Sequence, residues 1–289
     1  MGKIFKALEK FGKTIEEEQK PIKEPSNQTH PDLNKIQGQV SINKKNLNKE
    51  DDVKKIIPQR TPVGNLTGLD PFLVSALNPN SIEAEQFRNL KNSILFPEKG
   101  IPPRTIMITS TAPGEGKSFV ASNLAISIAQ SIDEHVLLMD CDLRKPSIHS
   151  MFGFDDVNGL SEYLSTARPI SSLLLTTFLD KLKILPAGHI PENPSELLSS
   201  EQMKNLLHEV KSRYEDRYII VDTPPPYITS ETSALARQID GIILIVRQGR
   251  SRRQDIFDVI EIYGREKIIG VVYNDAKALI GYGKYGYGK

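Results

Sequence analysis

From residue 105 onward, short apolar runs alternate with longer stretches of helical periodicity. The runs are rich in Ile, Val and Leu and cover residues 105–109, 136–140, 182–185, 218–222, 241–246 and 268–273. Continuous apolar runs of this length are typical of parallel strands that are buried on both faces. The stretches between them predict helices at 119–131, 199–214, 230–238 and 252–264. The alternation predicts an α/β fold, with a doubly wound, mainly parallel sheet covered by helices on both faces.

The amino-terminal part of the chain has a different pattern. Residues 1–18 predict an amphipathic helix, because apolar residues recur there at helical spacing: Ile4, Leu8, Phe11 and Ile15. The apolar stripe of such a helix requires a cover, which is a partner protein, a membrane surface or the chain's own globular domain. Residues 19–80 are rich in Lys, Asn, Gln and Pro without a sustained period, and they predict a flexible linker.

The remaining boundaries follow from these patterns. We predict a globular domain over residues 81–276 that begins with a helix at 81–96, and a Gly/Tyr-rich tail over residues 277–289. The formal net charge of +1 predicts no nucleic-acid partner. Cys141 is the one cysteine, which excludes an internal disulfide and favours a reducing compartment. No apolar run approaches the roughly 20 residues that cross a bilayer, so we expect a cytoplasmic chain.

The first apolar run leads into a loop that has the features of a phosphate-binding site. Gly114 and Gly116 let the backbone turn its amide groups inward, and the helix that follows adds its positive end. Lys117 is placed to reach the outer phosphates and Ser118 to ligate Mg²⁺. Thr111 stands at the first glycine of the pattern GxxxxGK(S/T). We predict a P-loop NTPase fold with these nucleotide-binding residues: Pro113, Gly114, Glu115, Gly116, Lys117, Ser118 and Phe119.

Two further strands are followed by carboxylates. Asp140 and Asp142 lie on one side of an extended segment, since side chains alternate along a strand, and Asp222 ends another run. Together with the loop they predict a site for phosphoryl transfer, in which Ser118, Asp142 and Asp222 hold Mg²⁺. Asp140 or Asp142 then accepts a proton from an incoming hydroxyl. Aspartates after strands also serve as helix caps or turn residues, and that alternative stays open.

Arg144 follows the two carboxylates, and we predict that it contacts a phosphate; an ion pair with a nearby acid is the alternative. The tail carries Tyr282, Tyr285 and Tyr287 between glycines, so each phenol is able to enter an active site in extended form. A sticky end that stacks on a partner explains the same composition.

These motifs together resemble the bacterial tyrosine kinases of capsule and exopolysaccharide systems, in their stand-alone cytoplasmic form. The resemblance covers residues 81–289 and rests on the loop 110–118, the segments 137–144 and 219–224, and the terminal tyrosines. It implies ATP- and Mg²⁺-dependent autophosphorylation of Tyr282, Tyr285 and Tyr287, between subunits. It also implies Asp140 as the base or metal-site partner, with Asp142 and Asp222 serving Mg²⁺.

The same resemblance implies partners. Glu85, Arg88 and Lys91 are similar to the family's assembly motif on one helix face, which implies a ring-type homo-oligomer, and Lys91 replaces the usual arginine. A membrane-bound polysaccharide co-polymerase is implied as the activator, which recruits the kinase to the inner face of the membrane.

Two other functions remain open. One is a nucleotide switch of the partition or cell-division-positioning type, whose members carry a lysine where this chain has Ala112. The other is a scaffold that binds ATP without useful turnover.

Overall fold

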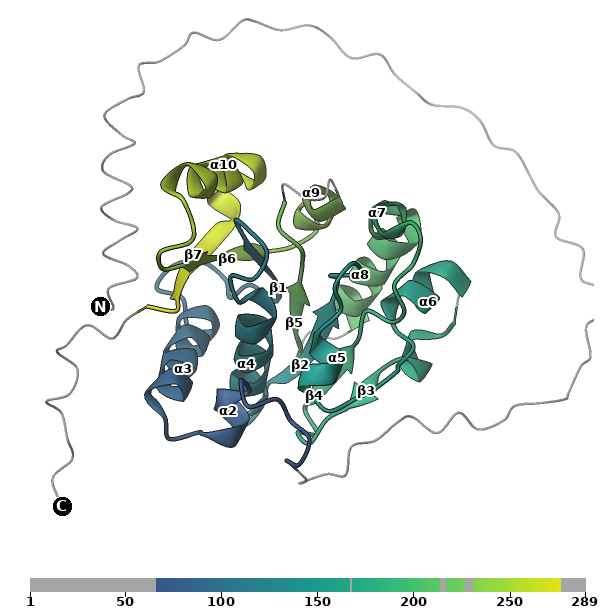
Figure 1. Ribbon diagram of the computed structural model, residues 1–289, viewed down its shortest axis with the longest axis horizontal. Coiled ribbons are helices and arrows are strands. Elements are labelled where there is room, and N and C mark those ends of the chain that lie inside the picture. Colours follow the sequence, from purple (N-terminus) through teal and green to yellow (C-terminus); the bar gives the residue numbers. More distant parts are fainter. Residues whose placement is uncertain (1–65, 167, 214–216, 227–230, 277–289) are drawn as a thin grey trace, which may run out of the picture. The chain divides into compact units, whose positions relative to one another are not determined.

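The computed structural model describes residues 66–166, 168–213, 217–226 and 231–276 (Figure 1). All of them belong to a compact unit that extends from Ile57 to Lys289. The predicted amino-terminal helix, most of the predicted linker and the tyrosine tail lie outside the described residues. None of the helices in the described ranges is long and apolar enough to cross a bilayer.

A seven-stranded sheet forms the centre of the fold, with strand order β3-β4-β2-β5-β1-β6-β7. The strands are β1 (Thr105–Ser110), β2 (His135–Asp140), β3 (Leu175–Thr176), β4 (Leu182–Leu185), β5 (Arg217–Asp222), β6 (Gly241–Arg247) and β7 (Ile268–Asn274). All neighbouring pairs are parallel except β3 and β4. The doubly wound, mainly parallel sheet predicted from the six apolar runs is therefore confirmed.

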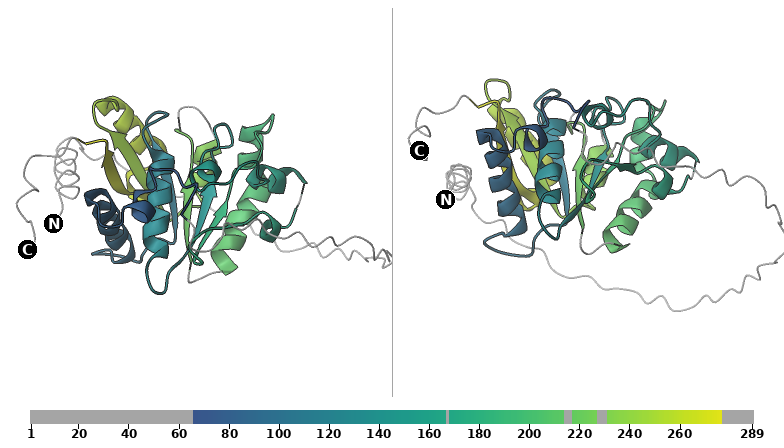
Figure 2. Two further views of the ribbon diagram at one scale, coloured as in Figure 1. Left: turned by 60° about the horizontal axis from the view of Figure 1, so that its bottom comes forward. Right: turned by 90° about the horizontal axis from the view of Figure 1, so that it is seen from below.

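Each central strand is buried on both faces, and its side chains alternate between two apolar cores. In β1, Ile106 and Ile108 belong to one core and Met107 to the other. The first core includes residues of α2, α3, α4 and α5, and the second includes residues of α6 to α10. The sheet therefore lies between two helical layers, as Figures 1 and 2 show. This double cover explains why the strands read as continuous apolar runs.

The helices connect the strands and cover both faces of the sheet (Figure 1). Their bounds are α2 (Val74–Leu77), α3 (Ile82–Leu95), α4 (Lys117–Ala129), α5 (Ile148–Met151), α6 (Leu160–Thr166), α7 (Pro194–Ser199), α8 (Glu201–Arg213), α9 (Glu231–Ala236) and α10 (Arg253–Tyr263), with 3₁₀ turns at Ile170–Ser172 and Arg265–Lys267. Helix α4 is buried almost throughout, since it packs between the sheet and α3. It carries the phosphate-binding loop at its amino end.

The ordered domain begins earlier than residue 81, so the predicted linker boundary at residue 80 is corrected. Leu73 is completely buried, and the backbone of Ser75 in α2 donates to the Asn123 side chain of α4 at 2.9 Å. The Gln130 amide also donates to the carbonyl of Ser75. The isolated aliphatic residues of this stretch have no period, and the sequence pattern therefore missed a segment that packs through a few long-range contacts.

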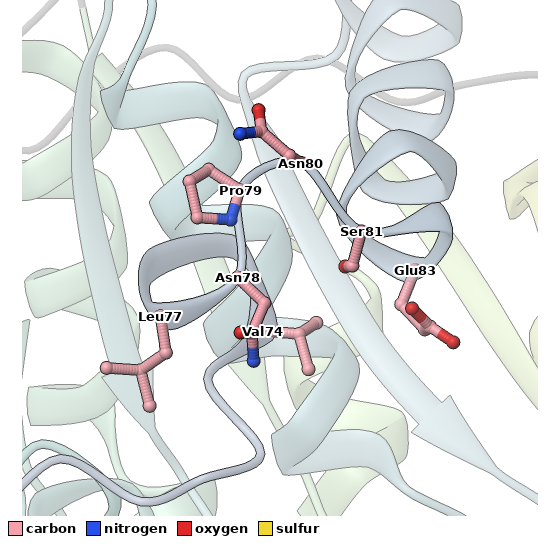
Figure 3. A pocket seen from close by; sticks show the side chains of 7 residues that line it. All are labelled: Val74, Leu77, Asn78, Pro79, Asn80, Ser81 and Glu83. Atoms are coloured by element: carbon pink, nitrogen blue, oxygen red, sulfur yellow. The ribbon is translucent and has the colours of Figure 1, made fainter.

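The corner between α2 and α3 is open to solvent. Ser81 caps α3 by accepting a hydrogen bond from the backbone of Ala84 at 3.1 Å. A pocket of about 370 Å³ surrounds this corner (Figure 3) and is lined by Val74, Leu77, Asn78, Pro79, Asn80, Ser81 and Glu83. Because α2 contacts Asn123 and Gln130, this pocket lies toward the end of α4 that is opposite to the glycine loop.

Two other predicted elements differ from the structure. The helix predicted over residues 199–214 is split, because Ser200 adopts an extended backbone between α7 and α8. The Ser200 hydroxyl then accepts a hydrogen bond from Met203 and caps α8. The short strand β3 was not predicted; it has two residues and pairs antiparallel to β4, which is too short to produce a sequence pattern.

Candidate active site

The strand order brings three predicted segments to one edge of the sheet. Strand β5 lies between β1 and β2, so the carboxyl ends of these three strands are adjacent. Asp140 at the end of β2 pairs in register with Asp222 at the end of β5. Ile108 of β1 is the other neighbour of Asp222, two residues before the glycine loop begins. Parallel α/β sheets bind their ligands at this edge, where the strand order reverses.

The glycine loop adopts backbone angles that other residues rarely reach. Gly114 and Gly116 have φ values of +75° and +97°. A Cβ atom at Gly116 would collide with the Asn274 side chain, so this position requires glycine for space as well as for conformation. Gly116 is the N-cap of α4 and has no side chain to cap it. The loop therefore presents backbone amides at the positive end of a buried helix, which is an anion-binding arrangement.

Lys117 supplies the positive charge of this loop. Only 6% of it is exposed, yet no hydrogen bond or ion pair joins its ammonium group to another residue in the described ranges. Burial raises the pKa of both Asp142 and Asp222, and the charge of Lys117 counteracts this rise, which places Lys117 near the two carboxylates. A mostly buried ammonium group without a protein acceptor is well suited to bind an anionic ligand.

Ser118 and Asp222 form the second part of the site. The Ser118 hydroxyl donates to Oδ2 of Asp222 at 2.5 Å, whereas Oδ1 of Asp222 is buried and has no hydrogen-bond partner among the described residues. Burial, followed by the nearby charge of Asp140, raises the pKa of Asp222 to about 8. A buried carboxylate oxygen without a donor is costly unless a ligand satisfies it. The Ser118 hydroxyl oxygen and Oδ1 of Asp222 fit a magnesium ion, which uses one or two protein oxygens when phosphates and water complete its shell.

Within the described ranges, no group of three or more His, Cys, Asp or Glu side chains is arranged to hold a metal ion on its own.

Asp140 is held differently from Asp222, although both are completely buried. Its Oδ1 accepts from the backbone of Asp142, and its Oδ2 accepts from the backbones of Ser147 and Ile148, each at 3.1 Å. Burial raises the pKa of Asp140 to about 6, and these backbone hydrogen bonds counteract the rise. Asp140 thus orders the loop that leads into α5, a role that matches the cap-or-turn alternative.

Asp142 is partly exposed, and its pKa is raised mainly by burial and lowered by the charge of Lys117. Its Oδ1 accepts from the backbone of Lys145 at 3.1 Å. The exposed Arg144 donates to the hydroxyl of Ser195 in α7 at 2.7 Å.

Two loop residues predicted to bind the nucleotide have side chains with other partners. The Glu115 carboxylate is completely buried, and it accepts from the Thr111 hydroxyl, the Ala112 backbone and the Ser251 hydroxyl. Phe119 packs edge-on against Phe87 of α3, with ring centroids 5.5 Å apart. Their side chains stabilise the loop and the start of α4, so only the backbone of these residues remains available to a nucleotide.

Sequence analysis missed the contacts that hold the loop from the side of β6 and β7. Arg247 donates to the carbonyl of Gly114 at 2.8 Å and pairs with Asp275 at 2.9 Å. The Asn274 amide donates to the carbonyl of Glu115 at 2.8 Å. The only signal in the sequence was the position of these residues at the ends of two strands of the same edge, which does not indicate a contact with the glycine loop.

The predicted assembly residues lie on α3. Arg88 pairs with Glu85 at 2.5 Å and donates to the carbonyl of Pro79 at 2.7 Å, while Lys91 is partly buried. The tail residues Tyr282, Tyr285 and Tyr287 lie outside the described residues.

The fold and the site define a P-loop NTPase. A family model described as "ParA: NUBPL iron-transfer P-loop NTPase" matches residues 103–278. This family binds nucleotides, and the predicted nucleotide cofactor is confirmed at that level. Structures of more distant P-loop ATPases share the fold, among them a ParA family ATPase from Chlorobium tepidum, with a TM-score of 0.50 and 19% identity over 61% of this chain and 75% of that chain.

More similar proteins define the family more narrowly. Tyrosine-protein kinase YwqD of Bacillus subtilis is 34% identical over 217 residues, which cover 74% of this chain and 90% of the relative. Tyrosine-protein kinase wzc of Salmonella typhimurium is 30% identical over 79% of this chain, which spans 32% of that relative. The kinase domain of Escherichia coli tyrosine kinase ETK superposes with a TM-score of 0.65 and 30% identity, covering 81% of this chain and 93% of that chain. The chain belongs to the bacterial tyrosine-protein kinases, and the predicted enzyme class is confirmed.

Proposed function

We propose that this kinase transfers the γ-phosphoryl group of ATP to its own terminal tyrosines, Tyr282, Tyr285 and Tyr287, in a neighbouring subunit, and that this reaction regulates exopolysaccharide or capsule synthesis or export. The observation that carries the proposal is that two buried side chains of opposite charge, each with a polar atom that lacks a partner among the described residues, lie at one edge of the sheet. A buried ammonium group without a protein acceptor, Lys117, lies beside a buried carboxylate with an unsatisfied oxygen, Asp222. Both groups require a bound anion and cation, which ATP and magnesium supply together.

In this proposal the loop residues 113–119 hold the phosphates through their backbone amides and Lys117. Ser118 and Asp222, with Asp142 beside them, are the residues that would hold Mg²⁺, which neutralises charge on the phosphates when bound. Arg144, although it donates to Ser195 here, is near enough in sequence to Asp142 to remain a proposed phosphate contact.

The transfer forms a bond between the tyrosine phenol oxygen and the γ-phosphorus and breaks the bond from that phosphorus to the β–γ bridging oxygen, leaving ADP. The phenol proton passes to a carboxylate. Asp142 fits this role better than Asp140, because Asp142 is partly exposed, whereas both oxygens of the completely buried Asp140 accept backbone hydrogen bonds. Asp140 then acts by holding the loop that carries Asp142.

We further propose that the kinase acts in the cytoplasm as a ring-type oligomer, recruited to the inner face of the membrane by a membrane-bound polysaccharide co-polymerase. Glu85, Arg88 and Lys91 support self-association, since Glu85 and Arg88 are exposed or partly exposed on one face of α3. The ion pair between Arg88 and Glu85 is solvent-exposed, and such a pair contributes little to the stability of a single subunit. These residues therefore remain available for an interface.

The test is incubation of the full-length protein with ATP and magnesium, followed by detection of phosphotyrosine, with and without the cytoplasmic part of a candidate activator. We expect tail labelling that disappears in Lys117→Met and in the triple variant Tyr282→Phe, Tyr285→Phe, Tyr287→Phe. Tyr273→Phe is the matched control, because Tyr273 is 55% exposed on β7 and lies outside the tail. Labelling that persists in the triple variant would contradict the proposed acceptor.

ATP hydrolysis without phosphotyrosine would instead support a nucleotide switch of the partition or cell-division-positioning type, and ATP binding without either activity would support a scaffold. Mixing Lys117→Met protein with the triple tail variant tests transfer between subunits. If transfer occurs in trans, the tail of the Lys117→Met subunit becomes labelled although that subunit is inactive.

A further inference from the structure

Four arginines lie in or next to the turn between β6 and α10, at positions 247, 250, 252 and 253; Arg247 ends β6 and Arg253 begins α10. Three of them have recorded partners. Arg247 binds the Gly114 carbonyl and Asp275, Arg252 pairs with Asp255 at 2.9 Å, and Arg253 lies over the ring of Phe257 at 5.3 Å. Arg250 differs, because its exposed guanidinium makes no hydrogen bond or ion pair with another residue in the described part of the chain.

Arg250 nevertheless lies directly against the phosphate-binding loop. From the position that a Cβ atom would occupy at Gly114, Nη1 of Arg250 is 3.4 Å away, and Cζ and Nη2 are each 3.8 Å away. Three guanidinium atoms at nearly equal distance mean that the flat group lies over this glycine. An unpaired cation therefore lies on the loop whose amides bind phosphate.

The turn that carries Arg250 is fixed to the loop on both sides of this residue. Before it, Arg247 donates to the Gly114 carbonyl at 2.8 Å; after it, the Ser251 hydroxyl donates to the buried Glu115 carboxylate. The Ser251 hydroxyl also accepts from the Arg247 backbone at 2.9 Å, which closes the turn. The backbone of Arg250 is thus held in a defined position relative to the loop, while its side chain makes no hydrogen bond within the described residues and is available to a ligand.

The charges at this edge of the sheet favour an anionic partner for it. Burial and, after it, the charges of Asp140 and Asp142 raise the pKa of Asp222, and the charge of Lys117 counteracts this rise. A nucleotide triphosphate adds several negative charges to this group. Lys117 acts on both Asp142 and Asp222, and the charge of Lys145 acts on Asp142. A guanidinium presents a planar fork of donors that matches phosphate oxygens.

We propose that Arg250 is a phosphate ligand of the bound nucleotide, supplied from the β6–α10 turn and held over the loop through Ser251 and Glu115. This inference rests on the proposed binding of ATP at this site and adds a residue outside the loop to it. Arg250 contacts the phosphate chain, so its contribution depends on the number of phosphates and is independent of the base.

The test is equilibrium binding of ATP (used as a non-hydrolysable analogue, so that no phosphoryl transfer occurs), ADP and adenosine to the full-length protein by calorimetry, in magnesium-containing buffer. In Arg250→Ala we expect the affinity for ATP and ADP to fall about tenfold, or about 1.4 kcal/mol, and the affinity for adenosine to change less than twofold. Arg250→Lys keeps the charge and recovers part of the loss. Arg253→Ala is the control, because it removes the same charge three positions along the chain, at the start of α10, while the guanidinium that it removes lies over Phe257.

Three outcomes would overturn the proposal: unchanged ATP affinity in Arg250→Ala, an equal loss for adenosine, or an equal loss in Arg253→Ala. The second would indicate a contact with the base or ribose, and the third a general effect of charge. Since binding is measured without phosphoryl transfer, a protein that binds ATP but shows no phosphotyrosine leaves this test intact and contradicts only the kinase reaction.

Discussion

The ends of β2 and β5 look alike in the sequence and differ in the folded protein. Each is an apolar strand that ends in aspartate, and Asp140 and Asp222 pair in register on neighbouring strands, both completely buried. Backbone amides satisfy both oxygens of Asp140, whereas Oδ1 of Asp222 has no hydrogen-bond partner in the described part of the chain. The same motif thus provides a loop-ordering residue in one strand and a residue that requires a ligand in the next.

This difference explains how one edge of a sheet combines rigidity with binding. At the end of β2, the Asp140 carboxylate accepts hydrogen bonds from the backbone of residues 142–148, and Asp142 is thereby held in place. At the end of β5, Oδ1 of Asp222 accepts no hydrogen bond from a described residue, and burial and the charge of Asp140 raise the pKa of this carboxyl group. A ligand that brings positive charge removes the cost of burying this carboxylate, and without a ligand a proton removes it below about pH 8.

The largest expected effect comes from removing the charge at the β5 end. Asp222→Asn keeps the size of the side chain but weakens the proposed magnesium site, so turnover falls by roughly 10²–10³, or about 3–4 kcal/mol in the barrier. The affinity for ATP changes much less, because Lys117 and the loop amides still hold the phosphates. Steady-state kinetics with a direct binding measurement checks this, and an equal loss of turnover and affinity would indicate that Asp222 is only structural.

A smaller and local effect is expected at the β2 end. Asp140→Asn places an NH₂ group opposite backbone donors, so at least one of the hydrogen bonds from Asp142, Ser147 or Ile148 is lost. We expect the amide hydrogens of Ser147 and Ile148 to exchange at least about tenfold faster, which corresponds to about 1.4 kcal/mol.

Hydrogen exchange followed by mass spectrometry or NMR measures this rate, and Asp222→Asn is the matched control. Unchanged exchange in Asp140→Asn, or equal acceleration in both variants, would remove the distinction between the two strand ends.

A further effect is expected on the pH dependence of stability in the nucleotide-free protein. Folding raises the pKa of Asp222 from 3.8 to about 8 and that of Asp140 from 3.8 to about 6. The folded protein therefore holds protons that the unfolded chain releases, and these two groups make the free energy of unfolding decrease as the pH rises from about 4 to about 8. Asp222→Asn removes the larger part of this slope.

Urea unfolding at several pH values between 5 and 8 measures the difference between variant and wild type, in which the other titrating groups cancel. Parallel stability curves for the two proteins would show that Asp222 does not hold a proton in this range.

The sequence by itself determined the parallel sheet, the position of its six longer strands and the glycine loop. These features are local, since a doubly buried strand must be apolar at every position, and Gly114 and Gly116 serve a backbone conformation that few other residues adopt. The packed segment around Leu73, the two-residue strand β3 and the break at Ser200 escaped the sequence pattern because they depend on contacts with distant residues.

Only the tertiary structure decided which side chains at the sheet edge serve the loop and which face a ligand. Glu115 reads as a loop residue, yet its carboxylate is tied to Ser251, which is 136 positions away. Asp140 and Asp222 are equivalent until the loop 142–148 folds back on one of them. Hydrogen-bond donors that arrive from remote parts of the chain determine whether a buried carboxylate is satisfied, and a linear sequence does not state where those donors lie.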